Sequence, residues 1–268
     1  MSFYKNKLSI ITTAALVSFS HSAFTEEQPE LQDMSDPLAV FTQAGAGYTD
    51  KGINLKIGQT YDTGSDITMG MNIIEVKGIA GELTGFSSGN ERDDSIDSLR
   101  FRNFTVDLTN GRGKQIDVNL AFTDEAGAQG TASYSFIQAL PKMGPVNLYP
   151  LAGAGVAFGE SFDPLDAGAG AAQDRWDLHG SFYVVGLYSK VEITDKWWFN
   201  YNPMYMGTIS GSDTYKNAGL DGDDTLLLHE VVLSYQINAR TNVRYFANWS
   251  ENKNFSSGDH RIEANYQF

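Results

Sequence analysis

The chain has 268 residues, of which 19% are charged and 12% are aromatic, and it contains 27 glycines and no cysteine. This composition excludes a disordered chain and a disulfide-rich scaffold. The formal net charge is -14. Because a nucleic-acid partner requires a basic surface, we expect none.

The first residues have the layout of a secretory signal peptide. Lys5 and Lys7 precede an apolar run over residues 8–19, and small residues follow, among them Ser22 and Ala23. We expect residues 1–22 to be removed. The apolar run is too short to cross a bilayer as a helix, and no later apolar run reaches about 18 residues. A membrane form of this chain would therefore have to be a β-barrel.

An acidic segment follows the signal peptide. Residues 23–37 carry five acidic side chains and no basic one. They predict a flexible periplasmic leader ahead of a barrel domain over residues 38–268. Three further acidic stretches, at 80–97, 159–177 and 210–224, have the character of surface loops.

From residue 38 onward, apolar and polar residues alternate with the period of a half-buried β-strand. In chain order the alternation predicts twelve strands, at 38–48, 52–62, 66–79, 98–109, 114–123, 130–140, 146–158, 180–193, 197–207, 227–237, 243–249 and 260–268. The alternation slips at Ile73/Ile74 and at Arg102/Asn103, where we expect β-bulges.

Short segments rich in turn-forming residues alternate with longer and more acidic loops along the chain. One exception, at 49–52, is short where a loop is expected. An even number of antiparallel strands, with short turns at one rim and longer loops at the other, predicts an all-β fold. The predicted architecture is a transmembrane antiparallel up-and-down β-barrel with both termini in the periplasm.

A soluble β-sandwich or a lipocalin-like barrel would also show alternating strands. The exterior of such a protein would be charged, whereas the polar positions of these strands include few Lys and Glu residues. Aromatic residues also gather near the predicted strand ends, as expected of interfacial girdles. They are Trp197, Trp198, Phe199, Tyr245, Trp249, Tyr266 and Phe268. Both observations favour the membrane barrel.

The last predicted strand alternates through Ile262, Ala264, Tyr266 and Phe268. This ending resembles the C-terminal signature by which bacterial outer-membrane β-barrel proteins are recognised by their assembly machinery. The resemblance implies residence in a Gram-negative outer membrane. It also implies the barrel assembly machinery, outer-membrane lipid and lipopolysaccharide as partners. Twelve-strand relatives include channels, autotransporter domains and a phospholipase, so the fold does not settle the function.

If the apolar residues face lipid, the polar residues between them face the lumen. The candidate pore-lining residues are Lys190, Glu192, Asn200, Asn202, Glu230, Arg244, Arg261 and Glu263. A barrel of about twelve strands is wider than a filled eight-strand barrel and narrower than an open porin. We therefore expect a narrow polar channel for passive passage of small hydrophilic solutes, with no cofactor. Two alternatives are a non-conducting barrel in which these charges pair and plug the lumen, and a surface-recognition protein acting through its loops.

An enzyme is a third alternative. His179 and Ser181 resemble the His-x-Ser pair of outer-membrane phospholipase and lipid A deacylase barrels, where His activates Ser for acyl transfer. The resemblance implies a lipid-acyl hydrolase. No Asn follows Ser181, and no third orienting group can be identified, so we expect a protein that is not an enzyme.

A metal site is the last candidate. Asp221, Asp223 and Asp224 supply clustered carboxylate oxygens, which suit Ca²⁺. The spacing differs from that of an EF-hand, and a solvated acidic turn is the simpler interpretation.

Overall fold

Antiparallel β-strands make up most of the chain from residue 43 onward. The computed structural model describes residues 31–49, 51–81, 96–123, 127–160 and 176–268. The strands are β1 (Gln43–Thr49), β2 (Gly52–Tyr61), β3 (Thr68–Ile79), β4 (Ser98–Asp107), β5 (Arg112–Thr123), β6 (Gly127–Gln138), β7 (Val146–Glu160), β8 (Trp176–Glu192), β9 (Trp197–Tyr201), β10 (Met204–Gly211), β11 (Thr225–Asn238), β12 (Thr241–Ser250) and β13 (Asp259–Gln267).

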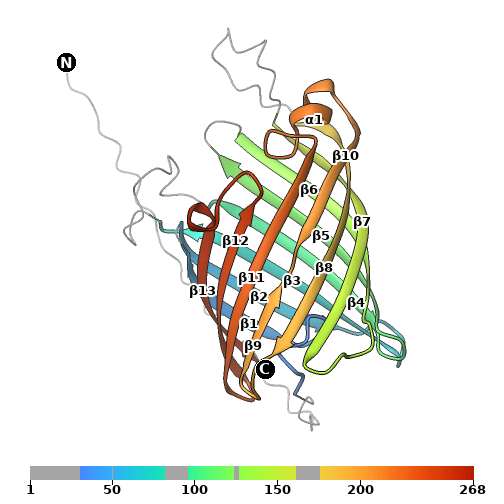
Figure 1. Cartoon of the computed structure of the whole chain (residues 1–268), viewed down its shortest axis with the longest axis vertical. Coiled ribbons are helices and arrows are strands. Elements are labelled where there is room, and N and C mark those ends of the chain that lie inside the picture. The colour runs from blue at the N-terminus through green and yellow to red at the C-terminus, as the bar shows by residue number, and fades with distance from the viewer. Residues whose placement is uncertain (1–30, 50, 82–95, 124–126, 161–175) are drawn as a thin grey trace, which may run out of the picture. The chain divides into compact units, whose positions relative to one another are not determined.

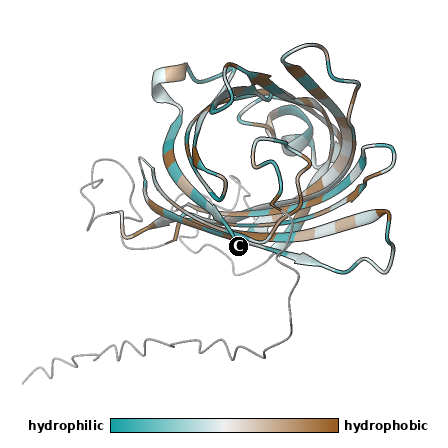
Figure 2. Ribbon diagram, turned by 90° about the horizontal axis from the view of Figure 1, so that it is seen from below, coloured by the Kyte–Doolittle hydropathy of each residue, from teal (hydrophilic) through white to brown (hydrophobic). Residues whose placement is uncertain are grey.

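The strands close into a ring, as Figures 1 and 2 show from two directions. Apart from β9 and β10, each strand pairs with its neighbours in sequence, and β1 pairs with β13. Strands β9 and β10 both lie between β8 and β11, separated by Asn202 and Pro203. They are thus two halves of one barrel strand. The structure confirms the prediction of a closed antiparallel barrel of twelve strands.

The two rims of the barrel differ. At one rim, which we call the turn end, short connections join the strands at residues 62–67, 108–111, 139–145, 193–196 and 239–240. The first and last strands also meet there, since Phe268 donates a backbone hydrogen bond to Thr42. At the other rim, the loop end, lie the helix α1 (Asp213–Ala218) and the 3₁₀ turn η2 (Phe255–Ser257). Among the described residues, no helix has the length and apolar character needed to span a membrane.

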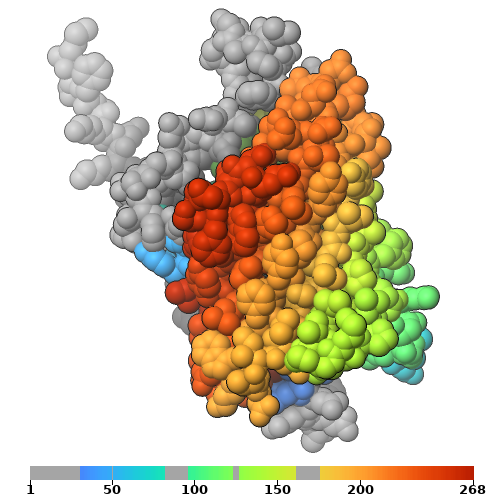
Figure 3. Space-filling model, viewed as in Figure 1, coloured from blue at the N-terminus to red at the C-terminus, as the bar shows by residue number. Residues whose placement is uncertain are grey.

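The outer face of the ring is apolar. Figure 3 shows this face over β7 to β13, where the strands form a continuous surface. Exposed large side chains on the outer positions of the strands include Leu55, Ile57, Ile74, Phe101, Ile116, Phe136, Val185, Leu233 and Ile262. A barrel surrounded by water would turn such residues inward, whereas lipid favours them on the outside.

The predicted aromatic girdles are partly corrected by the structure. Trp197, Tyr266 and Phe268 are exposed near the turn end. Trp198 instead points inward and is 4% exposed, because it occupies the alternate position of β9. Nearer the loop end, the ring of Trp249 stacks on His229, with 5.0 Å between the centroids.

The four residues of the predicted assembly signature follow the alternation of β13. Ile262, Tyr266 and Phe268 are exposed on the outer face, and Ala264 shares that face. The Tyr266 and Phe268 rings make an edge contact with centroids 5.1 Å apart. Recognition of this ending by the assembly machinery stays a prediction.

Both predicted β-bulges are wrong. The pairing of β3 and β4 continues without a register shift through Ile73/Ile74 and Arg102/Asn103. The alternation slips there because Ile73 and Phe104, on inward positions, are apolar and belong to a hydrophobic cluster inside the barrel. The register shifts that do occur lie at Ile53/Leu55, Ala157/Phe158, Thr208/Ser210 and Gln236/Asn238.

The first predicted strand is too long. The alternation predicts a strand over 38–48, whereas β1 begins at Gln43. Residues 31–42, which we call the inner segment, instead contact the inner wall at the turn end, where Val40 is 4% exposed. The part of the predicted flexible leader at 31–37 therefore makes defined contacts, while 23–30 and the predicted signal peptide lie outside the described residues.

The outer face generates a prediction about stability. Ile57 lies in the middle of β2 on this face, so Ile57→Lys would place a charge in hydrocarbon and should lower the free energy of unfolding in lipid by about 2–4 kcal/mol. Ile67→Lys is the matched control, since Ile67 is equally apolar but lies in a turn. Its cost should be about 0–1 kcal/mol. Urea titration in lipid vesicles measures both, and equal costs would contradict a lipid-facing wall.

Candidate functional site

Charged side chains meet in the middle of the barrel lumen. Glu75 on β3 accepts hydrogen bonds from Arg102 on β4, at 3.1 Å, and from Arg261 on β13, at 2.9 Å. Glu263 on β13 pairs with Lys56 on β2. Strand alternation brings all five side chains to the inner face.

The acidic members of this network are deeply buried. The Glu75 side chain is 3% exposed and that of Glu263 is 0% exposed. Glu263 also accepts a hydrogen bond from Asn54, at 2.9 Å. A buried carboxylate without a partner would be costly, so the pairing accounts for the presence of these charges.

A second pair extends the network along the same wall. The Arg100 guanidinium on β4 donates two hydrogen bonds to the Asp117 carboxylate on β5, one of them from Nε at 2.8 Å. This two-point geometry suits a guanidinium and a carboxylate.

Arg244 on β12 has a different environment. Its Nε donates to the Ser234 hydroxyl at 3.1 Å, and its Nη2 lies 3.4 Å from the Asn200 side-chain oxygen. The Phe246 ring lies beside the guanidinium, which is 4.9 Å from its centroid, and the guanidinium of Arg261 lies 4.1 Å from the same centroid. Within the described part of the chain, the hydrogen-bonding partners of Arg244 are therefore neutral.

The remaining predicted lumen residues fall into two groups. Lys190 and Glu192 lie near the turn end, where Lys190 contacts Glu192 at 3.1 Å and Lys142 contacts Glu192 at 2.7 Å. Asn202, near the middle, donates a hydrogen bond to Glu230 at 2.7 Å.

Asn200 also lies deep in the wall. It is 2% exposed, and its side chain donates to the Ser189 carbonyl at 2.6 Å. Asn200 thus joins β9 to β8 close to the break between β9 and β10, and its side-chain oxygen also lies near Arg244. A pore-lining role for all eight predicted residues stays a prediction.

Several residues of the charged network are absent from the predicted set, namely Asn54, Lys56, Glu75, Arg100, Arg102 and Asp117. They lie on β2 to β5. Lys56 and Asp117 sit in regular alternation and could have been found by the same reasoning. Glu75 lies next to the slip at Ile73/Ile74 and Arg102 lies in the other slip, and at both places the inner and outer faces could not be told apart from sequence.

Two adjoining cavities lie along the lumen. The one nearer the loop end has a volume of about 510 Å³ and reaches Ser250 and Gly258. The other, of about 340 Å³, lies in the middle of the barrel and ends against Met34 and Pro37 of the inner segment. The residues that line both are Arg100, Arg102, Tyr188, Asn202, Glu230, Asn248 and Asp259. Their shared lining makes the two cavities one polar space.

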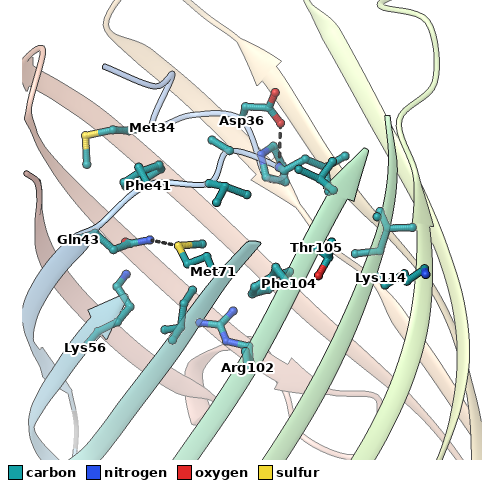
Figure 4. Close-up of a pocket in the computed structure, with 18 of the residues that line it drawn as sticks. Met34, Asp36, Phe41, Gln43, Lys56, Met71, Arg102, Phe104, Thr105 and Lys114 are labelled. Atoms are coloured by element: carbon teal, nitrogen blue, oxygen red, sulfur yellow. Dashed lines mark hydrogen bonds between the residues drawn. The ribbon is translucent and has the colours of Figure 1, made fainter. Parts of the chain in front are cut away.

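A smaller cavity of about 140 Å³ adjoins the inner segment on the wall of β2 to β6. Figure 4 shows the segment from Met34 to Phe41 crossing the lumen beside this cavity, with Arg102 and Lys56 beyond it. Gln43 donates to the sulfur of Met71, at 3.6 Å, where the chain enters β1.

The structure does not bring His179 and Ser181 together as a base and nucleophile. A register shift in the pairing of β7 with β8 falls at His179, so the two residues no longer share a face by simple alternation. His179 hydrogen-bonds with Gln129 at 2.9 Å. The Ser181 hydroxyl lies 2.7 Å from that of Ser210.

The three aspartates of the metal candidate do not converge either. Asp221 accepts a hydrogen bond from Ser250 at 3.0 Å, and Asp223 accepts one from Asn252 at 3.2 Å. Among the described residues, no group of three His, Cys, Asp or Glu side chains is arranged to hold a metal ion.

Solved structures with a similar fold include bacterial porins. The NanC porin has a TM-score of 0.49 and 8% sequence identity, covering 85% of this chain and 98% of its own. The KdgM porin, solved in complex with disordered oligogalacturonate, has a TM-score of 0.46 and 8% identity, covering 85% and 99%. The outer membrane channel DcaP of Acinetobacter baumannii has a TM-score of 0.37 and 11% identity, covering 89% and 67%. No family model and no curated protein matches the sequence. The function is therefore argued from the residues of this chain.

The buried network generates a prediction about stability. Glu263→Gln removes the carboxylate opposite Lys56 and leaves the ammonium buried without a counter-charge, which should lower the free energy of unfolding by about 3 kcal/mol or more. Asp213→Asn is the matched control, because the side chains of Asp213 and its partner Lys216 are 94% and 44% exposed. Its cost should be about 0–1 kcal/mol. Urea unfolding in detergent micelles compares the two, and equal costs would contradict a buried network.

Proposed function

We propose that this protein is an outer-membrane channel for the passive passage of small hydrophilic solutes, with its turn end in the periplasm. The observation that carries the proposal is the polar space that runs from the loop end to the middle of a barrel whose outer face is apolar. Outer-membrane lipid and lipopolysaccharide are the partners that this outer face fits.

The distribution of ion pairs supports a conducting lumen. Lys56, Glu75, Arg102, Arg261 and Glu263 pair with one another along the wall formed by β13 and β1 to β4. Charges that plugged the lumen would have to join opposite walls, whereas these pairs join strands that are close neighbours. The pairs therefore leave the polar space beside the wall of β8 to β12 open to solutes.

The lining of this space suits small solutes with several hydrogen-bonding groups. Tyr188, Asn202 and Asn248 supply neutral polar groups, while Glu230 and Arg244 supply one charge of each sign. The two cavities, of about 340 and 510 Å³, are of the size that small-molecule sites have.

Single-channel recording tests the proposal. In planar bilayers, Glu230→Gln should shift the reversal potential toward anion selectivity and Arg244→Gln toward cation selectivity, because each removes one charge from the polar space. Arg112→Gln is the control, since Arg112 is exposed at the turn end. It should leave the selectivity close to that of the native protein.

The two lumen variants make the test specific, because leakage through damaged bilayers would not respond to them in opposite directions. Pure folded protein that gives no discrete channel events, either in native form or with the inner segment released, would overturn the proposal.

A further inference from the structure

We propose that the inner segment, residues 31–42, is a plug that closes the turn end of the barrel, and that full conductance requires its release. This inference rests on the proposed channel function. It assigns a gating role to residues that the sequence places in a flexible leader and a first strand.

The inner segment is attached to widely separated parts of the barrel wall. Gln32 and Gln267 of β13 share two hydrogen bonds, at 3.2 and 3.0 Å. Asp33 pairs with Lys190 of β8 at 2.9 Å. Between these two strands in the ring, the Met34 sulfur accepts hydrogen bonds from Gln236 of β11, at 3.4 Å, and Asn242 of β12, at 3.7 Å.

Apolar contacts extend this attachment to the rest of the ring. Val40 packs in a cluster with Met71 and Ile73 of β3 and Val106 of β4. Leu38 packs against this cluster and also against a second one. The second cluster consists of Ile137, Tyr149, Leu151 and Val184, on β6, β7 and β8. A segment that contacts β3, β4, β8, β11, β12 and β13 crosses the lumen rather than lying along one wall.

The wall is adapted to receive the segment. Inward residues near the middle of the barrel are charged, whereas those near the turn end include apolar residues. Among them are Met71, Ile73, Val106 and Ile137, none of which is more than 6% exposed. A lumen wall built to contact solutes and water would gain nothing from apolar side chains here, because their exposure to water is unfavourable. They are buried because the inner segment covers them.

The attachment can be broken without breaking the barrel. Between Asp33 and Val40 the backbone hydrogen bonds of the segment are local, from Asp36 to Asp33 at 3.0 Å and from Ala39 to Asp36 at 3.1 Å. Within the described residues, the backbone of the segment bonds to the wall only near its two ends, where Gln32 contacts the Gln267 side chain and Thr42 accepts from Phe268 beside β1. The contacts of Asp33, Met34, Leu38 and Val40 with the wall described above are made by side chains. Release of the segment from its clusters would therefore leave the strand pairing of the ring unchanged.

The charge of Asp33 is compatible with this attachment. Burial acts to raise the pKa of Asp33, but hydrogen bonds from Ser35 and Lys190 outweigh it, so that the pKa is lower than that of an ordinary carboxyl group. Asp33 therefore stays ionised opposite Lys190, whose other acidic contact is Glu192, itself paired with Lys142.

The first test releases the plug by substitution. Leu38→Asp combined with Val40→Asp places two carboxylates in the apolar clusters and should favour the released state. We expect the open probability in planar bilayers to rise by about tenfold or more, because the loss of a few buried contacts changes an equilibrium constant by about 5–30-fold. Leu31→Asp is the matched control, because Leu31 is 41% exposed, and it should behave like the native protein.

The second test locks the plug in place. The chain has no cysteine, so the double variant Met34→Cys/Gln236→Cys contains two thiols, one on the inner segment and one on β11. A short bis-methanethiosulfonate cross-linker should abolish the openings, and a reducing agent should restore them. Channel openings that continue unchanged after verified cross-linking would overturn the plug.

A third measurement does not depend on conductance. Ile73→Cys places a thiol beneath the inner segment, where Ile73 is 5% exposed. In the Leu38→Asp/Val40→Asp background, a water-soluble thiol reagent should modify this cysteine at least about tenfold faster than in the native background. Equal rates would overturn the plug even if the released variant assembled poorly.

The outcomes separate the two proposals. Equal openings in the native, released and locked proteins would refute the plug and leave the channel standing. No openings in any of them, with Ile73→Cys protected by the segment as expected, would refute the channel and leave the closure of the turn end standing.

Discussion

Pairing of every strand edge is the constraint on which the rest of this structure depends. In hydrocarbon a free backbone N–H or C=O group has no water to bond with, so a sheet that spans a membrane must close. Strand β1, which has 7 residues, completes the ring by pairing with β13 on one side and β2 on the other. Pro203 interrupts the ring between β9 and β10, yet the pairing is kept, because Leu187 donates to the Pro203 carbonyl and Asn202 donates to Glu230. Closure thus tolerates a break in one strand.

Closure also determines the chemistry of the lumen. Once the ring is closed, alternate side chains must point into a narrow interior, where a charge without a partner would be unfavourable. Glu75 and Glu263 are almost fully buried and each has a cationic partner. Because their partners come from nearby strands, the charges stabilise one wall and also leave a polar space beside the other. A stable charged wall and an open passage are therefore compatible in this barrel.

The alternation of apolar and polar residues was sufficient to predict the ring, its two rims and the outer face. The pore-lining role of the charged residues on β8 to β13 stays a prediction. The alternation failed near the turn end, where the inner face contacts protein instead of water. Period-two reasoning assumes that one face meets lipid and the other meets water, but near the turn end the inner face meets the inner segment. Ile73 and Phe104 are apolar for that reason, and their apolar character was misread as two bulges. The real register shift at His179 was missed because the predicted strand begins at residue 180, after the shift, although the outward apolar residues change from even positions at Trp176 and Leu178 to odd positions such as Val185.

The magnitudes of the contacts indicate what holds the inner segment in the lumen. The Asp33 side chain is 61% exposed, so its ion pair with Lys190 contributes about 0–1 kcal/mol. Burial of Val40, which is 4% exposed, contributes about 1.5–3 kcal/mol, and the partly buried Leu38 adds a smaller amount. The apolar clusters therefore dominate the closed state, and the ion pair serves mainly to orient the segment. Salt screens interactions between charges but does not screen the burial of apolar side chains. Closure should therefore depend on the fit of these side chains more than on ionic strength.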